Sequence, residues 1–164
     1  MVKLVLLNEK ALIRKLQDLP VKLQDRVLKS AAHNAMKPVL SAARSKVPVL
    51  YGLLKKALGI KSKLYRRNHT AIALAGARKG FGTEKTVEIA GKSMTTRRDP
   101  RHYSHLAERG TKAHEQPALK IQHPGAAPRP FLEPGFEQAK PAMIARFGRE
   151  IGKGLDRIAR RSVR

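Results

Sequence analysis

Apolar and polar positions recur along the chain with the period of two long amphipathic helices. In the first, over residues 21–47, apolar side chains recur every three or four residues and charged side chains occupy the opposite side. These charged residues are Lys22, Asp25, Arg26 and Lys29. The second helix is expected over residues 133–161, with the apolar stripe Phe136, Ala139, Met143, Phe147, Ile151, Leu155 and Ile158. The first stripe is rich in alanine, so it allows close packing against a sheet or a neighbouring subunit.

Prolines divide the helical segments. Asn8 is placed to cap a shorter N-terminal helix that continues to Leu19. Pro20 then marks either a kink or the first residue of the next helix. Because proline lacks an amide hydrogen and clashes with the preceding turn, Pro38 is expected to bend the first long helix and Pro48 to end it.

Four short segments have the pattern of strands. They are residues 2–7, 59–65, 70–77 and 85–90, where apolar and polar or small side chains alternate. The turn-prone and basic residues over 78–83 predict a hairpin connection. Together with the helices, these strands predict an α+β fold: a small, mainly antiparallel sheet packed by a long N-terminal helix and a C-terminal helix.

The remaining segments lack a clear period. Residues 92–101 are expected to form a flexible basic loop, and residues 102–109 suit either a strand or a short helix. The segment 110–130 is rich in proline and glycine, so it is expected to be irregular over most of its length. A chain of 164 residues with 41% hydrophobic residues suits a single domain over residues 1–164, with the tail 160–164 a candidate for disorder.

The charge of the chain restricts its function more than its hydropathy does. It carries 35 lysines and arginines against 12 aspartates and glutamates, a formal net charge of +23. Because self-repulsion on this scale disfavours an isolated compact chain, we expect an acidic partner: nucleic acid, an acidic protein surface or an anionic membrane. No apolar run approaches the length of about 20 residues that spans a bilayer. The pattern therefore predicts a soluble protein made in the cytoplasm, without a membrane partner.

The basic residues concentrate in two blocks. The first contains no acid and consists of Lys55, Lys56, Lys61, Lys63, Arg66 and Arg67. The second lies on or beyond the last helix and consists of Arg146, Arg149, Lys153, Arg157, Arg160, Arg161 and Arg164. Such blocks bind phosphates well, and alternation along a strand would place the charges of the first block on one face. With no Trp, four Phe and three Tyr, stacking platforms for single-stranded nucleic acid are scarce.

No constellation of residues predicts catalysis, a metal or a cofactor. The candidate metal ligands are His102, His105, His114 and His123. They lack the tight paired spacing with cysteine of structural zinc sites, and the chain has no cysteine. Ser104 and His105 lack the glycine pattern of a nucleophile elbow, and Glu108 beside Arg109 suits a structural ion pair or an interface charge. We therefore expect a protein that is not an enzyme.

Three motifs occur in order along the chain. They are Val47-Pro48-Val49-Leu50-Tyr51-Gly52-Leu53-Leu54, His102-Tyr103-Ser104-His105-Leu106-Ala107-Glu108-Arg109-Gly110-Thr111 and Pro128-Arg129-Pro130-Phe131-Leu132-Glu133-Pro134. With the helix between Leu19 and Val47 they span nearly the whole chain. This order resembles the tail-completion family of long-tailed double-stranded DNA bacteriophages, also described as head-to-tail joining or minor tail component proteins. The chain departs from the usual family pattern in a longer insertion over residues 115–127.

Each motif also has a physical role. Pro48 stops the helix and Gly52 permits a tight reversal. Gly110 lies where the backbone can take a positive φ, and Phe131 can anchor the last helix in the core. We expect these motifs to shape a core or subunit contact, through Pro48, Gly52, Leu53, Tyr103, Glu108, Gly110, Thr111, Pro130 and Phe131.

The resemblance implies a structural subunit that assembles into a ring, a hexamer in the family, at the neck or the top of the tail. Its partners would be further copies of itself, other neck or tail proteins such as head-closure, terminator or tail-tube subunits, and double-stranded DNA in the channel. The protein would be made in the host cytoplasm and located in the virion. Contacts with DNA or an acidic protein are expected from Lys55, Lys56, Lys61, Lys63, Arg66, Arg67, Arg157, Arg160 and Arg161.

Two other functional classes fit parts of the pattern. The charge is typical of a small, sequence-independent nucleic-acid-binding protein of the ribosomal or nucleoid type, although no recognition-helix motif is present. A toxin or hydrolase that uses the histidines is the third class. Mass measurement with and without DNA separates the first two, because a ring without DNA indicates the phage protein and a monomer that shifts only with DNA indicates the binder.

Overall fold

The computed structural model describes residues 9–48, 52–89, 92–116 and 121–162 of the chain. The described elements are the helices α1 (Glu9–Gln17), α2 (Val21–Ala35), α3 (Lys37–Lys46), α4 (Gly52–Ala57), α5 (Pro100–Arg109) and α6 (Leu132–Ser162), and the strands β1 (Leu58–Tyr65), β2 (Thr70–Ala77), β3 (Thr83–Ile89), β4 (Lys92–Arg98), β5 (His114–Gln116) and β6 (Ile121–His123). They confirm the predicted α+β class. The predicted strand over residues 2–7, its neighbour Asn8, and Val49, Leu50 and Tyr51 of the first motif lie outside the described residues.

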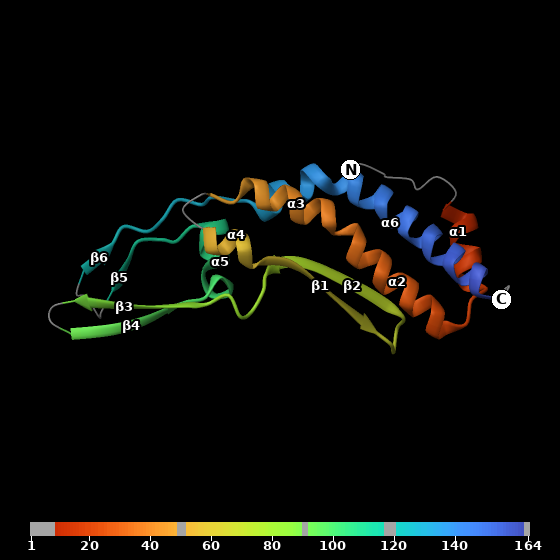
Figure 1. The fold of residues 1–164 in the computed structure, drawn as a ribbon. Coiled ribbons are helices and arrows are strands. Elements are labelled where there is room, and N and C mark those ends of the chain that lie inside the picture. Colours follow the sequence, from red (N-terminus) through yellow and green to blue (C-terminus); the bar gives the residue numbers. More distant parts are fainter. Residues whose placement is uncertain (1–8, 49–51, 90–91, 117–120, 163–164) are drawn as a thin grey trace.

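Helices and the first hairpin form three layers, with α2 in the middle (Figure 1). The long α6 packs along α2 and α3, and the antiparallel hairpin β1–β2 covers the other side of α2. The hairpin register runs from Leu58 opposite Ala77 to Tyr65 opposite Thr70. The outer face of α6 and the outer face of the hairpin therefore lie on opposite sides of the molecule.

Small residues allow α6 to approach α2 and α3 closely. The buried apolar side chains of α2 and α3 are Val27, Ala31, Ala35, Val39 and Ala43. A Cβ atom on Gly135 of α6 would lie 2.8 Å from the backbone nitrogen of Ala43, and one on Gly154 would lie 2.8 Å from Cγ1 of Val27. The alanine-rich stripe expected from the sequence thus packs mainly against a helix of the same chain.

Two apolar clusters hold these layers together. One contains the buried Ala43, Val47, Leu54, Leu58, Ala107 and Phe131, at the end of the molecule near α4 and α5. The other contains the buried Val27, Ala31 and Ile151, with Leu12 and Leu16 of α1 packed against it. Each cluster joins α6 to the N-terminal helices, so the C-terminal helix connects both halves of the core.

Prolines break the helices close to the expected positions. The first long helix divides at Met36, where α2 ends and α3 begins with Pro38 in its first turn. Pro20 is the N-cap residue of α2, which decides between the kink and the helix start left open by the sequence. α3 ends at Lys46, before Pro48, as predicted.

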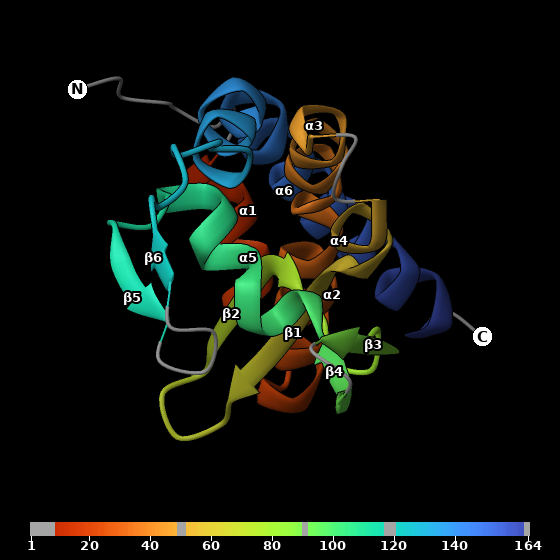
Figure 2. The same cartoon turned by 90° about the vertical axis from the view of Figure 1, so that its left-hand side faces the viewer.

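The strands form three separate two-stranded ribbons, where one small sheet was expected. β3 pairs with β4 and β5 pairs with β6, so the segment 78–83 connects two different ribbons and the predicted hairpin there is wrong. Both ribbons extend from the end of the molecule that holds α4 and α5, and they diverge when viewed from that end (Figures 1 and 2).

The flexible loop expected over residues 92–101 is also wrong. Residues 92–98 form β4, paired with β3, and α5 begins at Pro100. Backbone hydrogen bonds define such a ribbon, so β4 needs no alternation of apolar side chains that a sequence would display. The segment 102–109, left open between strand and helix, belongs to α5.

Three further expectations about segment ends need correction. The segment 110–130, expected to be irregular, contains the short ribbon β5–β6. α6 continues to Ser162, so residues 160–162 of the expected disordered tail are helical. Gly52 does not form a tight reversal with positive φ, because it is the first residue of the unpredicted helix α4.

No helix among the described residues combines the length and the apolar composition needed to cross a membrane.

Candidate functional site

A basic groove with a volume of about 1000 Å³ runs between α2 and the turn end of the hairpin β1–β2. It is lined by Val21, Lys22, Asp25, Arg26, Lys29, Ser62, Lys63, Leu64, Arg66 and His69. Because α2 supplies half of these residues and the hairpin the other half, the groove exists only where the two elements pack together. The packing uses the inward positions of β1, namely Ile60, Ser62 and Leu64, which alternate with exposed side chains.

Lysine and arginine side chains dominate the groove, and all of them are exposed. They are Lys22, Arg26 and Lys29 from α2, and Lys63 and Arg66 from the hairpin. Three ion pairs are present among the described residues, and none of them involves one of these cations. The groove therefore presents a concentration of positive charge without carboxylate partners in the part of the chain that the structure describes, which suits a multiply charged anion.

Asp25 is the one acid among the residues that line the groove, and it already has a partner. Its carboxylate is buried and lies 3.0 Å from Nδ1 of His69. His69 has φ 49°, an uncommon value for a residue other than glycine, in the turn that joins β1 to β2. The contact therefore fastens the hairpin turn to α2 and fixes one wall of the groove.

The basic residues singled out from the sequence are dispersed by the fold. Lys61 and Lys63 both lie on the exposed face of β1, and of the two only Lys63 also reaches the lining of the groove, together with Arg66 of the turn. The exposed Lys55 and Lys56 belong to α4, and Arg67 lies in the hairpin turn outside the groove lining. Arg157 and Arg160 are exposed on α6, which also includes Arg161.

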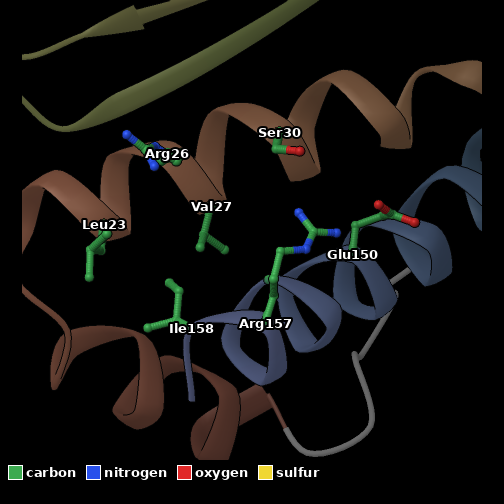
Figure 3. Close-up of a pocket in the computed structure, with 8 residues that line it drawn as sticks. Leu23, Arg26, Val27, Ser30, Glu150, Arg157 and Ile158 are labelled. Atoms are coloured by element: carbon green, nitrogen blue, oxygen red, sulfur yellow. The ribbon is translucent and has the colours of Figure 1, made fainter. Parts of the chain in front are cut away.

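A second pocket, of about 420 Å³, lies between α2 and α6 (Figure 3). Its lining residues are Leu23, Arg26, Val27, Ser30, Glu150, Gly154, Arg157 and Ile158. In Figure 3, Arg157 extends from α6 toward α2, beside the apolar side chains of Val27 and Ile158. Arg26 contributes to both pockets, so the basic groove continues around α2 toward α6.

Glu150 is the acid among the residues that line this second pocket, and hydrogen bonds from Asn34 and Lys153 fix its side chain. Burial raises its pKa, but hydrogen bonds from Asn34 and Lys153, together with nearby positive charge, outweigh burial and lower the pKa below the ordinary value of 4.5. The Asn34 amide donates to the carboxylate over 2.8 Å and the Lys153 ammonium over 3.4 Å. The carboxylate therefore stays ionised and joins α2 to α6.

The three sequence motifs meet at a junction around the start of α6. Glu108 of α5 accepts hydrogen bonds at 2.9–3.1 Å from the backbone amides of Phe131, Leu132 and Glu133. A carboxylate at this place satisfies amides that the helix itself leaves unpaired and complements the helix dipole. The expected role of Glu108 as an ion pair or interface charge is thus replaced by a capping role.

Gly110 supplies the turn that brings Glu108 to α6. Its φ of 73° and ψ of −178° confirm the predicted positive φ and lie in a region that is nearly restricted to glycine. A Cβ atom there would lie 2.5 Å from the carbonyl oxygen of Ala126. Next to it, Thr111 and Ala126 exchange two backbone hydrogen bonds at 2.9 and 3.0 Å.

The other motif residues surround the same core. Phe131 is fully buried, and Tyr103 packs against the cluster that contains it. In the first motif Leu54 is fully buried and Leu53 only partly, so Leu54 is the main core contact. Pro130 is exposed just before Phe131.

The histidines do not gather into one site. His102 and His105 lie on α5, whereas His114 and His123 are cross-strand partners whose rings stack 5.0 Å apart. Within the described part of the chain, no group of three or more histidines and acids is close enough to hold a metal ion.

Sequence reasoning missed the contribution of α2 to the groove. In the sequence, Lys22, Arg26 and Lys29 form the polar side of a predicted helix, for which solvent is the simplest environment. Their spacing of four and three residues places them on one helical face. What the spacing does not show is the hairpin that faces them.

These features define an α+β protein in which Asp25, Glu108 and Glu150 are engaged within its own fold, while the groove cations have no carboxylate partner among the described residues. The protein family described as "Bacteriophage HK97-gp10, putative tail-component" matches residues 10–110, which run from α1 through α5. The match covers more than half of the chain, and the chain belongs to this HK97-gp10-like family. No curated protein matches the chain, and no solved structure does.

Membership of this family gives the resemblance noted in the sequence a firm basis. The chain is a tail component of a tailed bacteriophage, and therefore a structural protein of the virion. The matched region contains both walls of the basic groove and the residues Glu108 and Gly110 of the junction.

Proposed function

We propose that this tail component is a tail-completion subunit, which forms a ring that finishes the tail and joins it to the DNA-filled head. In this role it has no enzymatic activity, and its partners are further copies of itself, other neck or tail proteins and the double-stranded DNA in the channel. The observation that carries the proposal is the basic groove, whose cations have no carboxylate partners within the described chain.

The groove suits phosphate groups better than it suits a small ligand. It is open to solvent, about 1000 Å³ in volume, and its cations come from two different elements. Contacts of lysine and arginine with phosphates are independent of base sequence, which is what a channel that holds any leading DNA end requires. The scarcity of aromatic residues also favours backbone contacts over base stacking.

The first test concerns assembly. Purified full-length protein should form a discrete ring without DNA, measured by native mass and by electron microscopy. A phage that lacks the protein should accumulate filled heads and unjoined tails, and supplying the protein should restore joining. A monomer that gains mass only with DNA, with normal phage in its absence, would instead favour a small sequence-independent DNA-binding protein.

The second test concerns the groove. The variant Lys22→Gln/Arg26→Gln/Lys29→Gln should weaken DNA binding and reduce the log–log salt slope by about 0.9 for each side chain that contacts a phosphate. The matched control is Lys55→Gln/Lys56→Gln, which removes cations from α4 outside the groove. Equal slopes for the two variants and the unmodified protein would remove DNA from the role of the groove.

A further inference from the structure

The outer face of the hairpin β1–β2 is exposed and partly apolar. Of the six large apolar side chains exposed in the described part of the chain, Tyr65, Ile72 and Leu74 lie on this face, with exposed fractions of 42, 40 and 63%. Lys61 pairs across the strands with Leu74 and Lys63 with Ile72. Neighbouring exposed apolar groups that alternate with cations indicate a protein contact better than they indicate solvent.

Nothing in the described chain covers this face. The other face of the hairpin packs on α2, and both outer edges of the two-stranded ribbon are unpaired. Lys63 places its ammonium 4.5 Å from the centre of the Tyr65 ring on the same face. The face thus has a basic side along β1 and an apolar side along β2.

A complementary surface lies on the opposite side of the same molecule. Along the exposed line of α6, Glu133 and Glu137 are followed one and two turns later by Pro141 and Ala145. The Glu137 side chain is 61% exposed and only loosely engaged, with Lys140 at 3.7 Å. Two acids spaced by about 6 Å along a helix match two lysines spaced by about 7 Å along a strand.

We propose that the outer hairpin face of one copy docks on the N-terminal half of α6 of the next copy. Lys61 and Lys63 then face Glu133 and Glu137, while Ile72 and Leu74 cover the small residues that follow the acids. This inference rests on the proposed ring and names the surfaces that would join its subunits. It also brings acids against bases in a chain whose net charge of +23 otherwise opposes association.

The three-layer arrangement supports a head-to-tail contact. The hairpin and α6 lie on opposite sides of α2 (Figure 1), so a joined pair keeps a free α6 surface on one copy and a free hairpin face on the other. A heterologous contact of this type closes into a ring if the rotation between copies allows it. A symmetric contact of two hairpin faces would bring lysines against lysines, which repel.

Charge reversal tests the pairing directly. Lys61→Glu/Lys63→Glu should weaken self-association of the DNA-free protein at least about tenfold, because like charges then face each other. Glu133→Lys/Glu137→Lys should do the same. An equimolar mixture of these two variants should associate again, measured by native mass and sedimentation, because each supplies one reversed surface.

Two controls separate this contact from folding and from the groove. Leu74→Asp removes the apolar contact with no change at α6 and should also leave monomers, with unfolding as cooperative as in the unmodified protein. Lys22→Gln/Arg26→Gln/Lys29→Gln should keep the assembly. If the unmodified protein forms rings that survive both reversals, this interface is wrong and the proposed function stands. If the unmodified protein forms no assembly and the phage does not need it, the proposed function fails first.

Discussion

The junction at the start of α6 and the basic groove beside α2 use charge in opposite ways. At the junction one carboxylate, that of Glu108, serves three backbone amides, and the neighbouring side chain of Phe131 is fully buried. In the groove the lysines and arginines are exposed, and no carboxylate of the described chain pairs with them. The comparison indicates that the carboxylate of the junction stabilises the fold, whereas the cations of the groove have no carboxylate partner among the described residues.

Three other acids of the chain, like Glu108, bind groups within the fold. Asp99 caps α5 by accepting a hydrogen bond from the amide of Arg101, Asp25 holds His69, and Glu150 binds Asn34. With 12 acids against 35 bases, acids engaged in this way cannot also neutralise the surface. Changes at the junction should therefore cost stability, and changes in the groove should not.

The largest loss of stability is expected at Phe131. Phe131→Ala leaves a cavity in the fully buried cluster and should lower the free energy of unfolding by about 3–5 kcal/mol. Denaturant unfolding measures this difference. Tyr65→Ala is the control, because Tyr65 is 42% exposed and should cost much less. Similar values for the two variants would contradict a core role for Phe131.

The second-largest loss of stability is expected for Gly110→Val. A β-branched side chain at φ 73° is strained by about 1–3 kcal/mol, and its Cβ would also meet the carbonyl oxygen of Ala126. The melting temperature of Gly52→Ala, a glycine with open space around it, provides the comparison. The proposed turn is wrong if Gly110→Val melts at the temperature of the unmodified protein.

Replacing Glu108 should have an intermediate effect. Glu108→Gln keeps the shape of the side chain but removes the charge that faces three amides, at a cost of about 1–2 kcal/mol. Glu115→Gln, also a loss of one negative charge but on the short strand β5, should be nearly neutral. Equal unfolding energies would mean that the cap contributes nothing measurable.

The groove variant Lys22→Gln/Arg26→Gln/Lys29→Gln is expected to change the free energy of unfolding very little. Because these side chains are exposed and have no carboxylate partner, stability should change by less than about 0.5 kcal/mol per site, and relief of repulsion favours a gain. Denaturant unfolding at low salt should show this most clearly. A loss comparable to that of Glu108→Gln would make the groove part of the folding core.

The smallest effect is expected from pH. Because the folded state lowers the pKa of Glu150 below 4.5, its contribution is fully present above that pH and is lost as the pH falls through the lowered pKa. Asn34→Ala removes the 2.8 Å hydrogen bond, so it should flatten the dependence of stability on pH below 4.5. A pH profile parallel to that of the unmodified protein would show that Asn34 does not set this pKa.

Sequence patterns predicted the structure correctly where it depends on residues within one segment. The long stripe of α6, the break near Pro38 and the positive φ of Gly110 were all predicted, because periodicity, proline chemistry and glycine conformation act locally. The strand over residues 92–98 was not predicted, because it forms by pairing with β3 and its own residues show no strand pattern. The cap by Glu108 was missed because its partners lie more than 20 residues away.

The amino-acid sequence by itself determined the α+β class, the helix breaks at Pro20, near Pro38 and before Pro48, and the excess of positive charge, because these depend on neighbouring residues and on composition. The tertiary structure alone decided where the charge acts. Packing the hairpin on α2 placed Lys22, Arg26 and Lys29 in one groove with Lys63 and Arg66 and left Lys55 and Lys56 outside it. Charges that are scattered along the chain become a site only when folding brings them together, since electrostatic attraction depends on distance in space and not on separation in sequence.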